Sequence, residues 1–237
     1  MTAVVDIRIP AKAESALKKR GFSVCKLPPH PALPSPVASH PDMLVFFAQD
    51  AVFCTRSYLS VAERELKMLS RVAQRPLRVL AEDVGNVYPH DVLLNAAPVG
   101  DRLLCLTKHT ANEIVARYRP ISVRQGYAKC STLPVGDNAI VTADPSITQA
   151  ARQNGIDVLT VREGSVGLEC YGTGFLGGAA SYAPYGDSRE IFFCGALSSH
   201  PDHAVISRFC NERGYETVSL SDDPLTDMGT IFLIEGE

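Results

Sequence analysis

A short apolar strand, a capped helix, a glycine and a second strand form a unit that recurs along the 237-residue chain. In the clearest copy, a strand over 139–142 precedes a helix opened by Asp144 and Pro145, and Gly155 separates this helix from a strand over 156–161. A unit of this kind cannot bury its own apolar face, so it has to pack against copies of itself. The repeat therefore predicts a ring of similar modules, with any chemistry on the central axis.

Four complete modules of the type strand–strand–helix–strand can be laid out along the chain. Two of their helices begin with a capping box, Ser60 with Glu63 and Thr110 with Glu113, in which each side chain satisfies a free backbone N–H. The modules are expected over residues 43–80, 91–123, 129–161 and 175–220. Their first strands, which should line the axis, are expected over residues 43–48, 91–97, 129–135 and 178–182.

The fifth module is divided between the two ends of the chain. Residues 229–234 read as a lone strand, whereas the N-terminus offers a strand over 4–8, a helix over 11–20 and a strand over 22–27. Pairing the terminal strands would complete this module and remove the open sheet edges. The sequence thus predicts an α/β fold, a five-module pseudo-symmetric propeller that forms a single domain over residues 1–237.

Two segments stand outside this pattern. Residues 28–41 are rich in proline, which favours a stiff spacer between modules over a peptide-docking motif. Residues 164–188 are rich in glycine, tyrosine and alanine. This second segment is predicted to be either a lid over the axis or a tolerated insertion.

The composition excludes several classes of partner and compartment. A formal net charge of −3, with lysines and arginines scattered, argues against nucleic-acid binding. No apolar run approaches the roughly 18 residues that span a bilayer, and the N-terminal residues lack a signal-peptide pattern. The seven cysteines form no CxxC motif, and buried thiols in a reducing cytoplasm account best for Cys25, Cys54, Cys105 and Cys194. We therefore expect a cytoplasmic protein without a membrane partner.

Four local motifs accompany the module order: His-Pro-Asp at 40–42 before an apolar strand, Pro-His-Asp-Val-Leu at 89–93, Tyr-Ala-Lys-Cys-Ser at 127–131 and Gly-Ala-Ala-Ser at 178–181. Together they resemble the pentein fold, the α/β-propeller of guanidino-group modifying enzymes such as dimethylarginine dimethylaminohydrolase, arginine deiminase and the amidinotransferases. The resemblance implies that Asp91 helps to hold a guanidinium group. Residues 125–131 are also similar to a bacterial branch of this fold that has no assigned reaction.

The chain departs from these enzymes at two positions that matter for chemistry. The enzymes use a cysteine near the C-terminus as nucleophile and a histidine as proton carrier, whereas Thr230 and Tyr127 stand at the corresponding positions. A tyrosine with a pKa near 10 cannot readily move protons at neutral pH, and threonine is a poor nucleophile without an adjacent base. Conventional guanidine chemistry is therefore not expected.

Polar side chains of the inner strands should converge on the axis. The predicted ligand-binding residues are Asp42, Asp91, Asn95, Lys129 and Ser181, with Gln125 and Thr230 nearby. Two carboxylates facing one cavity could grip a cation, but aspartates also cap turns before strands, and both interpretations remain open. We expect Asp91 to be the main anionic group and Lys129 its counter-charge, either around a zwitterionic ligand or as an ion pair that plugs the channel.

Cys130 is the candidate catalytic residue, because the neighbouring Lys129 could lower the pKa of its thiol. Successive residues of a strand point to opposite faces, however, so only one of the two can face the axis. We expect Lys129 to point inward, which leaves Cys130 as a packed thiol, a nucleophile or a redox sensor.

Neither a metal site nor a cofactor is expected. The segments 40–42 and 200–203 both look metal-like at first sight, but the second lies at a predicted helix start, which explains it better than zinc binding does. Residues 174–178 do not form a dinucleotide-binding motif. Two functions remain. The first is binding of a small cationic or zwitterionic ligand in an axial pocket, with a divergent hydrolase or transferase activity as an option. The alternative is a non-catalytic pentein that acts as a binding or assembly factor. The oligomeric state is not indicated.

Overall fold

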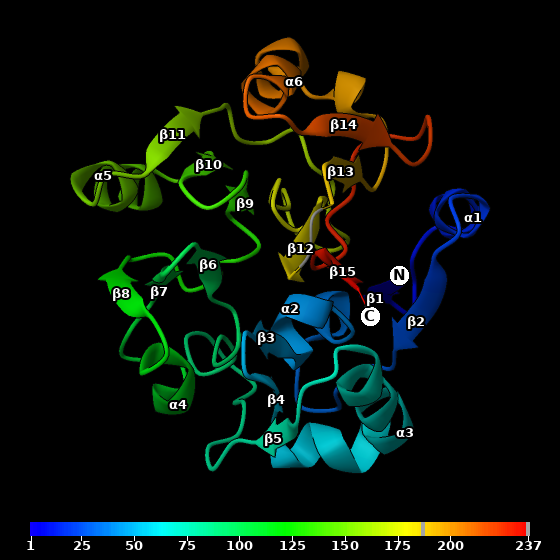
Figure 1. The fold of residues 1–237 in the computed structure, drawn as a ribbon, viewed down its shortest axis with the longest axis vertical. Coiled ribbons are helices and arrows are strands. Elements are labelled where there is room, and N and C mark those ends of the chain that lie inside the picture. Colours follow the sequence, from blue (N-terminus) through cyan, green and yellow to red (C-terminus); the bar gives the residue numbers. More distant parts are fainter. Residues whose placement is uncertain (186–187, 236–237) are drawn as a thin grey trace.

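The computed structural model describes residues 1–185 and 188–235, and within them the strands form five separate sheets around a common centre (Figure 1). Three sheets have three strands each. They are β3 (Phe46–Ala48), β4 (Ala51–Cys54) and β5 (Leu77–Val79); β6 (Ala97–Val99), β7 (Arg102–Cys105) and β8 (Arg119–Ser122); and β9 (Leu133–Pro134), β10 (Ala139–Thr142) and β11 (Asp157–Thr160). The other two sheets are β12 (Ser181–Tyr185), β15 (Ile231–Ile234), β1 (Thr2–Asp6) and β2 (Ser23–Leu27), and the pair β13 (Glu190–Phe193) and β14 (Glu216–Ser219).

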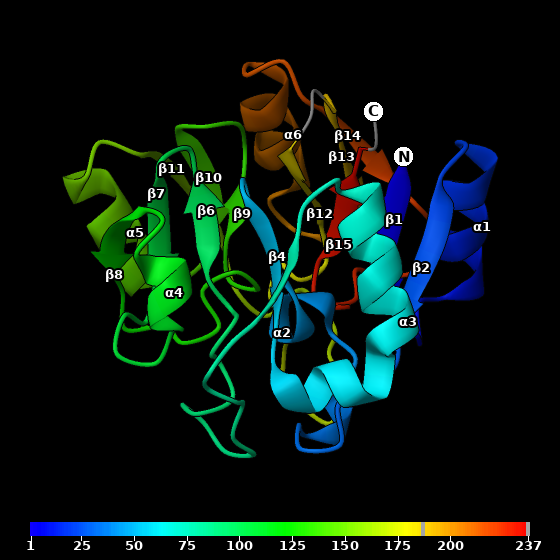
Figure 2. The same cartoon turned by 60° about the horizontal axis from the view of Figure 1, so that its bottom comes forward.

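Most helices lie outside these sheets, and one short helix lies near the centre (Figures 1 and 2). The outer helices are α1 (Ala11–Lys19), α3 (Arg56–Val72), α4 (Asn112–Val115), α5 (Pro145–Gln153) and α6 (His203–Asn211). The central one is α2 (Pro41–Leu44), and two 3-10 turns are η1 (Ser35–Val37) and η2 (Leu197–Ser199). In each three-stranded sheet the first two strands are antiparallel and the outer pair, joined through a helix, is parallel.

The two ends of the chain meet in one sheet, as the incomplete terminal modules predict. Strand β15 runs antiparallel to β1, with Ala3 opposite Leu233. Its other edge pairs in parallel with β12, which was expected to pair within the fourth module instead. Within the described residues, one isolated bridge, Ala180 with Phe193, connects that region to β13, and the Ser181 hydroxyl accepts the Phe192 N–H at 2.9 Å.

The predicted helix starts agree with the structure for one helix and differ for two. Helix α5 begins as predicted, since Asp144 Oδ1 accepts the Ile147 N–H at 2.8 Å. The prediction that a helix starts at Ser60 is wrong: α3 begins at Arg56, because the Thr55 hydroxyl accepts the Tyr58 N–H. The prediction for Thr110 is also wrong, since its hydroxyl donates to the Leu106 carbonyl and α4 starts two residues later.

The inner strands are shorter than the sequence suggests, and this determines where the polar candidates lie. Residues 91–96 and 128–132 form turns, and residues 41–44 form helix α2, so strands begin only at Phe46, Ala97 and Leu133. The expected strands over 91–97 and 129–135 are therefore wrong in their first halves. The predicted site residues of these modules occupy turns at the ends of inner strands.

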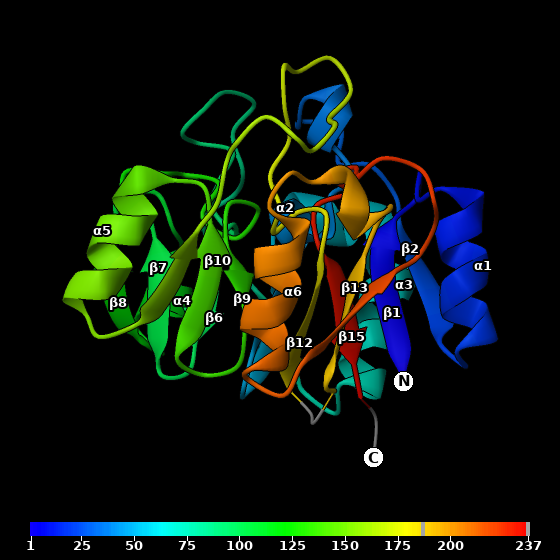
Figure 3. The ribbon, with the colours of Figure 1, turned by 90° about the horizontal axis from the view of Figure 1, so that it is seen from above.

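Three connecting segments gather at one end of the molecule, opposite the chain termini (Figure 3). They include the proline-rich residues 28–41, residues 81–91 and residues 162–177, which contain the first part of the glycine-rich segment 164–188. The proline-rich segment is held down, because the Arg8 guanidinium donates to the carbonyls of Ser35 and Pro36. Residues 186–187 of the glycine-rich segment lie outside the described residues. Within the described part, no helix is long and apolar enough to cross a membrane.

Candidate functional site

Asp42 lies at the centre of the molecule, in the first turn of α2. The Asp42 N–H donates to the Gly229 carbonyl at 3.0 Å, and this hydrogen bond holds the turn in place. The carboxylate is 1 % exposed, and its Oδ2 accepts the Thr230 hydroxyl at 2.9 Å and the Cys130 thiol at 3.0 Å. Burial raises the pKa of Asp42, and the nearby positive charge of Lys129 opposes this effect. Oδ1 has no hydrogen-bond partner among the described residues.

Lys129 and Cys130 both reach this centre, contrary to the expectation from strand alternation. They occupy a turn, which frees successive side chains from opposite faces, and Asn95 holds the turn by accepting both backbone N–H groups at 2.8 and 3.3 Å. Lys129 Nζ donates to the Thr230 hydroxyl at 3.0 Å and lies 5.3 Å from the Tyr182 ring. The Thr230 hydroxyl thus bridges the lysine and Asp42. Burial lowers the pKa of Lys129 to about 8.

Cys130 has the environment of a packed thiol. It is 4 % exposed, and burial together with the charge of Asp42 raises its pKa well above the ordinary value. The Sγ accepts from Asn95 Nδ2 at 3.2 Å while it donates to Asp42. A thiol that stays protonated is a weak nucleophile, so the surroundings disfavour covalent catalysis by Cys130.

Thiol labelling of the native protein tests this conclusion. All seven cysteines are free, and Cys170 is the exposed one. We expect a maleimide to modify one thiol per chain within minutes and Cys170→Ser to abolish this rapid reaction, with the remaining cysteines reacting only after denaturation. Mass spectrometry of the digested protein identifies the modified residue. Rapid modification of Cys130 in the folded state would contradict the assignment.

Asp91 lies apart from Lys129, so the expected Asp91–Lys129 pair is not formed. Among the described residues no ion pair involves Asp91, which is 1 % exposed; its Oδ2 accepts the Tyr127 hydroxyl at 2.6 Å. Burial, and then Asp91 itself, raises the pKa of Tyr127, so the phenol stays a hydrogen-bond donor. The Oδ1 atom of Asp91 has no partner within the described residues.

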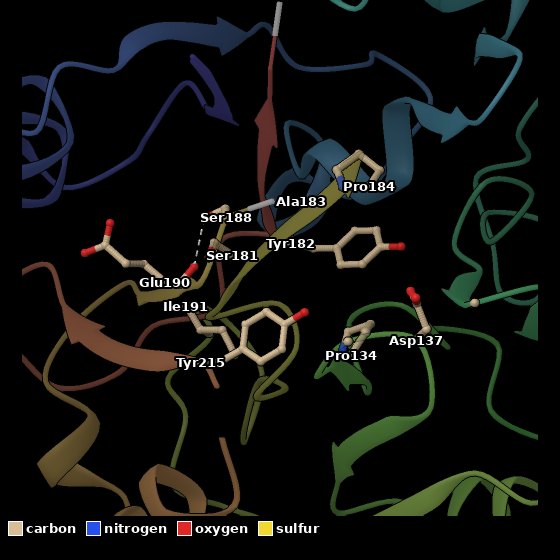
Figure 4. Close-up of a pocket in the computed structure, with 12 residues that line it drawn as sticks. Pro134, Asp137, Ser181, Tyr182, Ala183, Pro184, Ser188, Glu190, Ile191 and Tyr215 are labelled. Atoms are coloured by element: carbon tan, nitrogen blue, oxygen red, sulfur yellow. Dashed lines mark hydrogen bonds between the residues drawn. The ribbon is translucent and has the colours of Figure 1, made fainter. Parts of the chain in front are cut away.

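Two further candidates lie elsewhere. The Ser181 hydroxyl is engaged with the Phe192 N–H and borders a cavity of about 210 Å³, into which the rings of Tyr182 and Tyr215 point and which Asp137 faces (Figure 4). Gln125 donates to Asp144 at 3.3 Å and accepts the Tyr127 N–H at 3.1 Å. The structure therefore gathers Asp42, Asn95, Lys129, Cys130 and Thr230, but neither Ser181 nor Gln125.

Two members of the buried centre, His40 and Asp227, are not among the predicted site residues, although His40 belongs to the His-Pro-Asp motif at 40–42. Asp227 is 2 % exposed and accepts the N–H groups of Gly229 and Phe175 at 3.0 and 2.9 Å. Burial raises the pKa of Asp227 and lowers that of His40. The glycines at 178 and 229 are the sequence feature connected with these two residues. A Cβ on Gly178 would lie 2.0 Å from Asp227 Oδ1, and a Cβ on Gly229 would lie 2.1 Å from His40 Cβ.

The backbone at the centre also carries strain. Thr230 adopts a φ of +70° directly after Gly229 at +66°. Positive φ is unusual for a β-branched residue and persists only where surrounding contacts enforce it. Here the hydroxyl of Thr230, held between Lys129 and Asp42, supplies such contacts.

The architecture is that of the pentein-fold guanidino-modifying enzymes, as solved structures show. DDAH from Pseudomonas aeruginosa, a cysteine-to-serine mutant in complex with citrulline, aligns with a TM-score of 0.56 and 10% identity, covering 93% of this chain and 92% of the other. SxtG, an amidinotransferase from Microseira wollei in the saxitoxin pathway, aligns at 0.54 and 8% identity, covering 93% and 88%. Agmatine deiminase from C. jejuni aligns at 0.51 and 10% identity, covering 88% and 73%. The predicted resemblance to penteins is confirmed.

At the level of sequence, the chain belongs to the family of unknown function DUF6873, whose profile matches residues 4–232. No curated protein sequence matches it significantly.

Proposed function

We propose that the protein binds a small cation with several N–H donors, of the guanidino or amino-acid type, beside Asp91. The observation that carries this proposal is the state of the Asp91 carboxylate. It is buried, none of the described residues forms an ion pair with it, and Oδ1 lacks a partner. Burying a charge without compensation is costly, so such a carboxylate favours a positively charged ligand that supplies the missing donors.

Aromatic side chains around Asp91 support a cationic ligand. The Tyr127 ring contacts the ring of Tyr88, with centres 5.5 Å apart, and the ring of Phe175, with centres 6.3 Å apart. Tyr88 belongs to the segment 81–91 and Phe175 to the segment 162–177, which lie at the same end of the molecule (Figure 3). Aromatic faces attract organic cations by about 0.5–2 kcal/mol each. We propose that these two segments cover the ligand.

The solved neighbours support the guanidino class of ligand, because their names describe a citrulline complex, an amidinotransferase and an agmatine deiminase. A divergent hydrolase or transferase reaction in this chain would rely on Thr230, since Cys130 is a protonated, packed thiol. The Thr230 hydroxyl donates to the Asp42 carboxylate, which could act as its base, and accepts a hydrogen bond from Lys129 Nζ.

Our proposal includes the finer architecture. The five sheets would be the five modules of a closed, pseudo-symmetric propeller, a single domain over residues 1–237, with β15 completing the N-terminal module. Pairing of β1 with β15 supports this arrangement. The seven free cysteines agree with a reducing compartment, so we place the protein in the cytoplasm with a small-molecule partner.

Replacing Asp91 with Asn tests the ligand proposal. We expect wild-type protein to bind agmatine or arginine in calorimetric titrations, and norvaline, which lacks the guanidino group, to bind much more weakly. Asp91→Asn should reduce the affinity at least about tenfold, because a charged hydrogen bond contributes roughly 1.5–3 kcal/mol. Asp137→Asn, an exposed residue at the separate cavity, is the matched control and should bind normally.

Two outcomes would contradict this proposal: wild-type protein that binds none of the guanidino compounds, or Asp91→Asn that binds them unchanged. If Asp91→Asn does not fold, Tyr127→Phe provides a second test, because it removes the hydroxyl that orients the carboxylate while it keeps the ring. A Tyr127→Phe protein with unchanged affinity would then argue against a site at this position.

One observation favours the alternative of a non-catalytic binding or assembly factor. Four polar residues are at most 4 % exposed and form hydrogen bonds with one another: Asp42, Lys129, Cys130 and Thr230. A cluster of this kind would fill the axis of the protein as a structural element and leave no space for a ligand. Val87, Tyr88 and Tyr171 are large exposed apolar side chains on the segments 81–91 and 162–177. This alternative gains support if no guanidino or amino compound binds.

A further inference from the structure

His40, Cys130 and Asp227 bring three different donor atoms together in the buried centre. A nitrogen of the imidazole, the thiol sulfur and a carboxylate oxygen all lie within 4.8 Å of one another, and the three residues are 1–4 % exposed. They come from three distant segments: the residue before α2, the turn over 128–131 and the segment that precedes β15. No spacing motif in the sequence connects them.

The imidazole of His40 lacks the partners that a buried histidine normally has. Its Nδ1 forms no hydrogen bond within the described residues and lies 3.8 Å from Asp227 Oδ1. This distance is too long for a hydrogen bond, but it is close to the separation of two ligands that each lie about 2.0–2.2 Å from one metal ion. The gap between His40 and Asp227 therefore has the size of an ion.

The far side of the imidazole carries a second feature of metal centres. His40 Nε2 faces Asp6 Oδ2 at 3.9 Å, and Asp6 is itself held by the Arg8 guanidinium at 2.6 Å and the Ser39 hydroxyl at 2.9 Å. Histidine ligands commonly present their second nitrogen to a carboxylate, which orients the ring and raises its basicity. The 3.9 Å separation exceeds a hydrogen bond, so Asp6 would take that role only if the ring moved toward it when an ion binds.

We propose that His40 Nδ1, Cys130 Sγ and an oxygen of Asp227 bind one Zn²⁺ ion. Thiolate, imidazole and carboxylate form a donor set typical of zinc, which usually takes four ligands. Asp42 is not one of the three clustered ligands and lies beside them, with its Oδ2 3.0 Å from Cys130 Sγ, so the fourth position would be left to a water molecule. The ion would connect α2, the 128–131 turn and the C-terminal segment.

The formal charges of the cluster agree with a divalent ion. Counted formally as ionised, the two carboxylates Asp42 and Asp227 and the one ammonium Lys129 leave one negative charge, although burial opposes ionisation of all three groups. On binding, the Cys130 S–H bond breaks, its proton leaves to solvent, and the sulfur electron pair forms the bond to zinc. One Zn²⁺ and one thiolate together add a single positive charge and make the cluster neutral.

Close packing at two glycines and hydrogen bonds to one asparagine hold the proposed ligands in place without an ion. A Cβ on Gly174 would lie 2.5 Å from Asp227 Cβ, so this glycine and Gly178 allow the backbone to approach the carboxylate closely. Asn95 holds the turn that carries Cys130. Ligands that are held by packing and hydrogen bonds lose little freedom on binding a metal.

Metal titration of the full chain carrying Cys170→Ser tests this proposal, since that variant removes the exposed thiol. After treatment with a chelator, we expect the protein to bind one Zn²⁺ per chain and its melting temperature to rise with free zinc. Co²⁺ should produce a near-ultraviolet thiolate-to-cobalt absorption band. Cys130→Ala should abolish the band, and His40→Gln should weaken zinc binding at least tenfold. The control Cys194→Ala, another buried thiol, should retain both signals.

The absence of zinc binding or of the cobalt band in the Cys170→Ser protein would overturn the proposal, even if the Cys130 and His40 variants do not fold. A cobalt band that persists in Cys130→Ala would also overturn it. The Asp91→Asn protein should still bind zinc, because Asp91 is not a ligand. Loss of guanidino binding and loss of zinc binding are therefore separate results.

Discussion

A chain that ends at Leu225 should not unfold as a single cooperative unit. The truncation removes β15, whose residues Ile231, Phe232, Leu233 and Ile234 are all at most 5 % exposed. Burying an aliphatic or aromatic side chain contributes about 1.5–3 kcal/mol, so these residues together contribute roughly 6–12 kcal/mol. That is comparable to the whole free energy of unfolding of a typical domain, about 5–15 kcal/mol.

The loss should extend beyond the strand itself. Strand β15 pairs with β1 on one side and β12 on the other, so its removal exposes two sheet edges. Urea unfolding followed by circular dichroism, together with size-exclusion chromatography, would measure the effect. Leu233→Ala should cost about 2–5 kcal/mol, and Val205→Ala, on the surface of α6, should be nearly neutral. A truncated protein with wild-type cooperativity would show that the terminal strands do not hold the sheets together.

Gly229→Ala should be far more destabilising than Gly155→Ala. Both glycines have a left-handed backbone, with φ of +66° and +73°, so each substitution costs about 1–2 kcal/mol in conformational energy. At Gly155 the added Cβ meets no atom within 4 Å, whereas at Gly229 it would lie 2.1 Å from His40 Cβ. The clash falls in the closely packed centre, so the total for Gly229→Ala should exceed about 4 kcal/mol.

Denaturant unfolding of the two alanine variants separates the steric effect from the conformational one. We expect the midpoint of Gly155→Ala to decrease slightly with an unchanged slope. Gly229→Ala should either unfold at a much lower urea concentration or fail to fold. Equal effects of the two substitutions would mean that the centre can rearrange around an added methyl group. His40 and Asp227 would then not be held in a rigid arrangement.

Local signals in the sequence were sufficient where a few neighbouring residues determine the structure. Asp144 and Pro145 predict the start of α5 because the cap needs only the N–H of Ile147. The pairing of the terminal strands is predictable for a different reason: two incomplete modules each leave an unpaired edge. The substitutions at Tyr127 and Thr230 are equally visible, since they concern which groups are present rather than where they lie.

The polar centre was less predictable, because long-range contacts override strand alternation there. Lys129 and Cys130 would point to opposite faces of a strand, but the Asn95 side chain accepts both of their N–H groups and holds a turn instead. Asp91 and Lys129 start neighbouring modules and were expected to pair. Instead, the Tyr127 hydroxyl donates a hydrogen bond to Asp91, and the Thr230 hydroxyl accepts one from Lys129.

By itself, the sequence determined the repeating module, the pairing of the chain ends and the set of chemical groups available to the centre. Hydrophobic periodicity and capping carry that information because they act between residues close in the chain. Only the tertiary structure decided which groups meet. Asp42 and Thr230, 188 residues apart, share a hydrogen bond, and His40, Cys130 and Asp227 lie around one point. Contacts of this kind depend on how five separate sheets pack around a common centre, which no local pattern encodes.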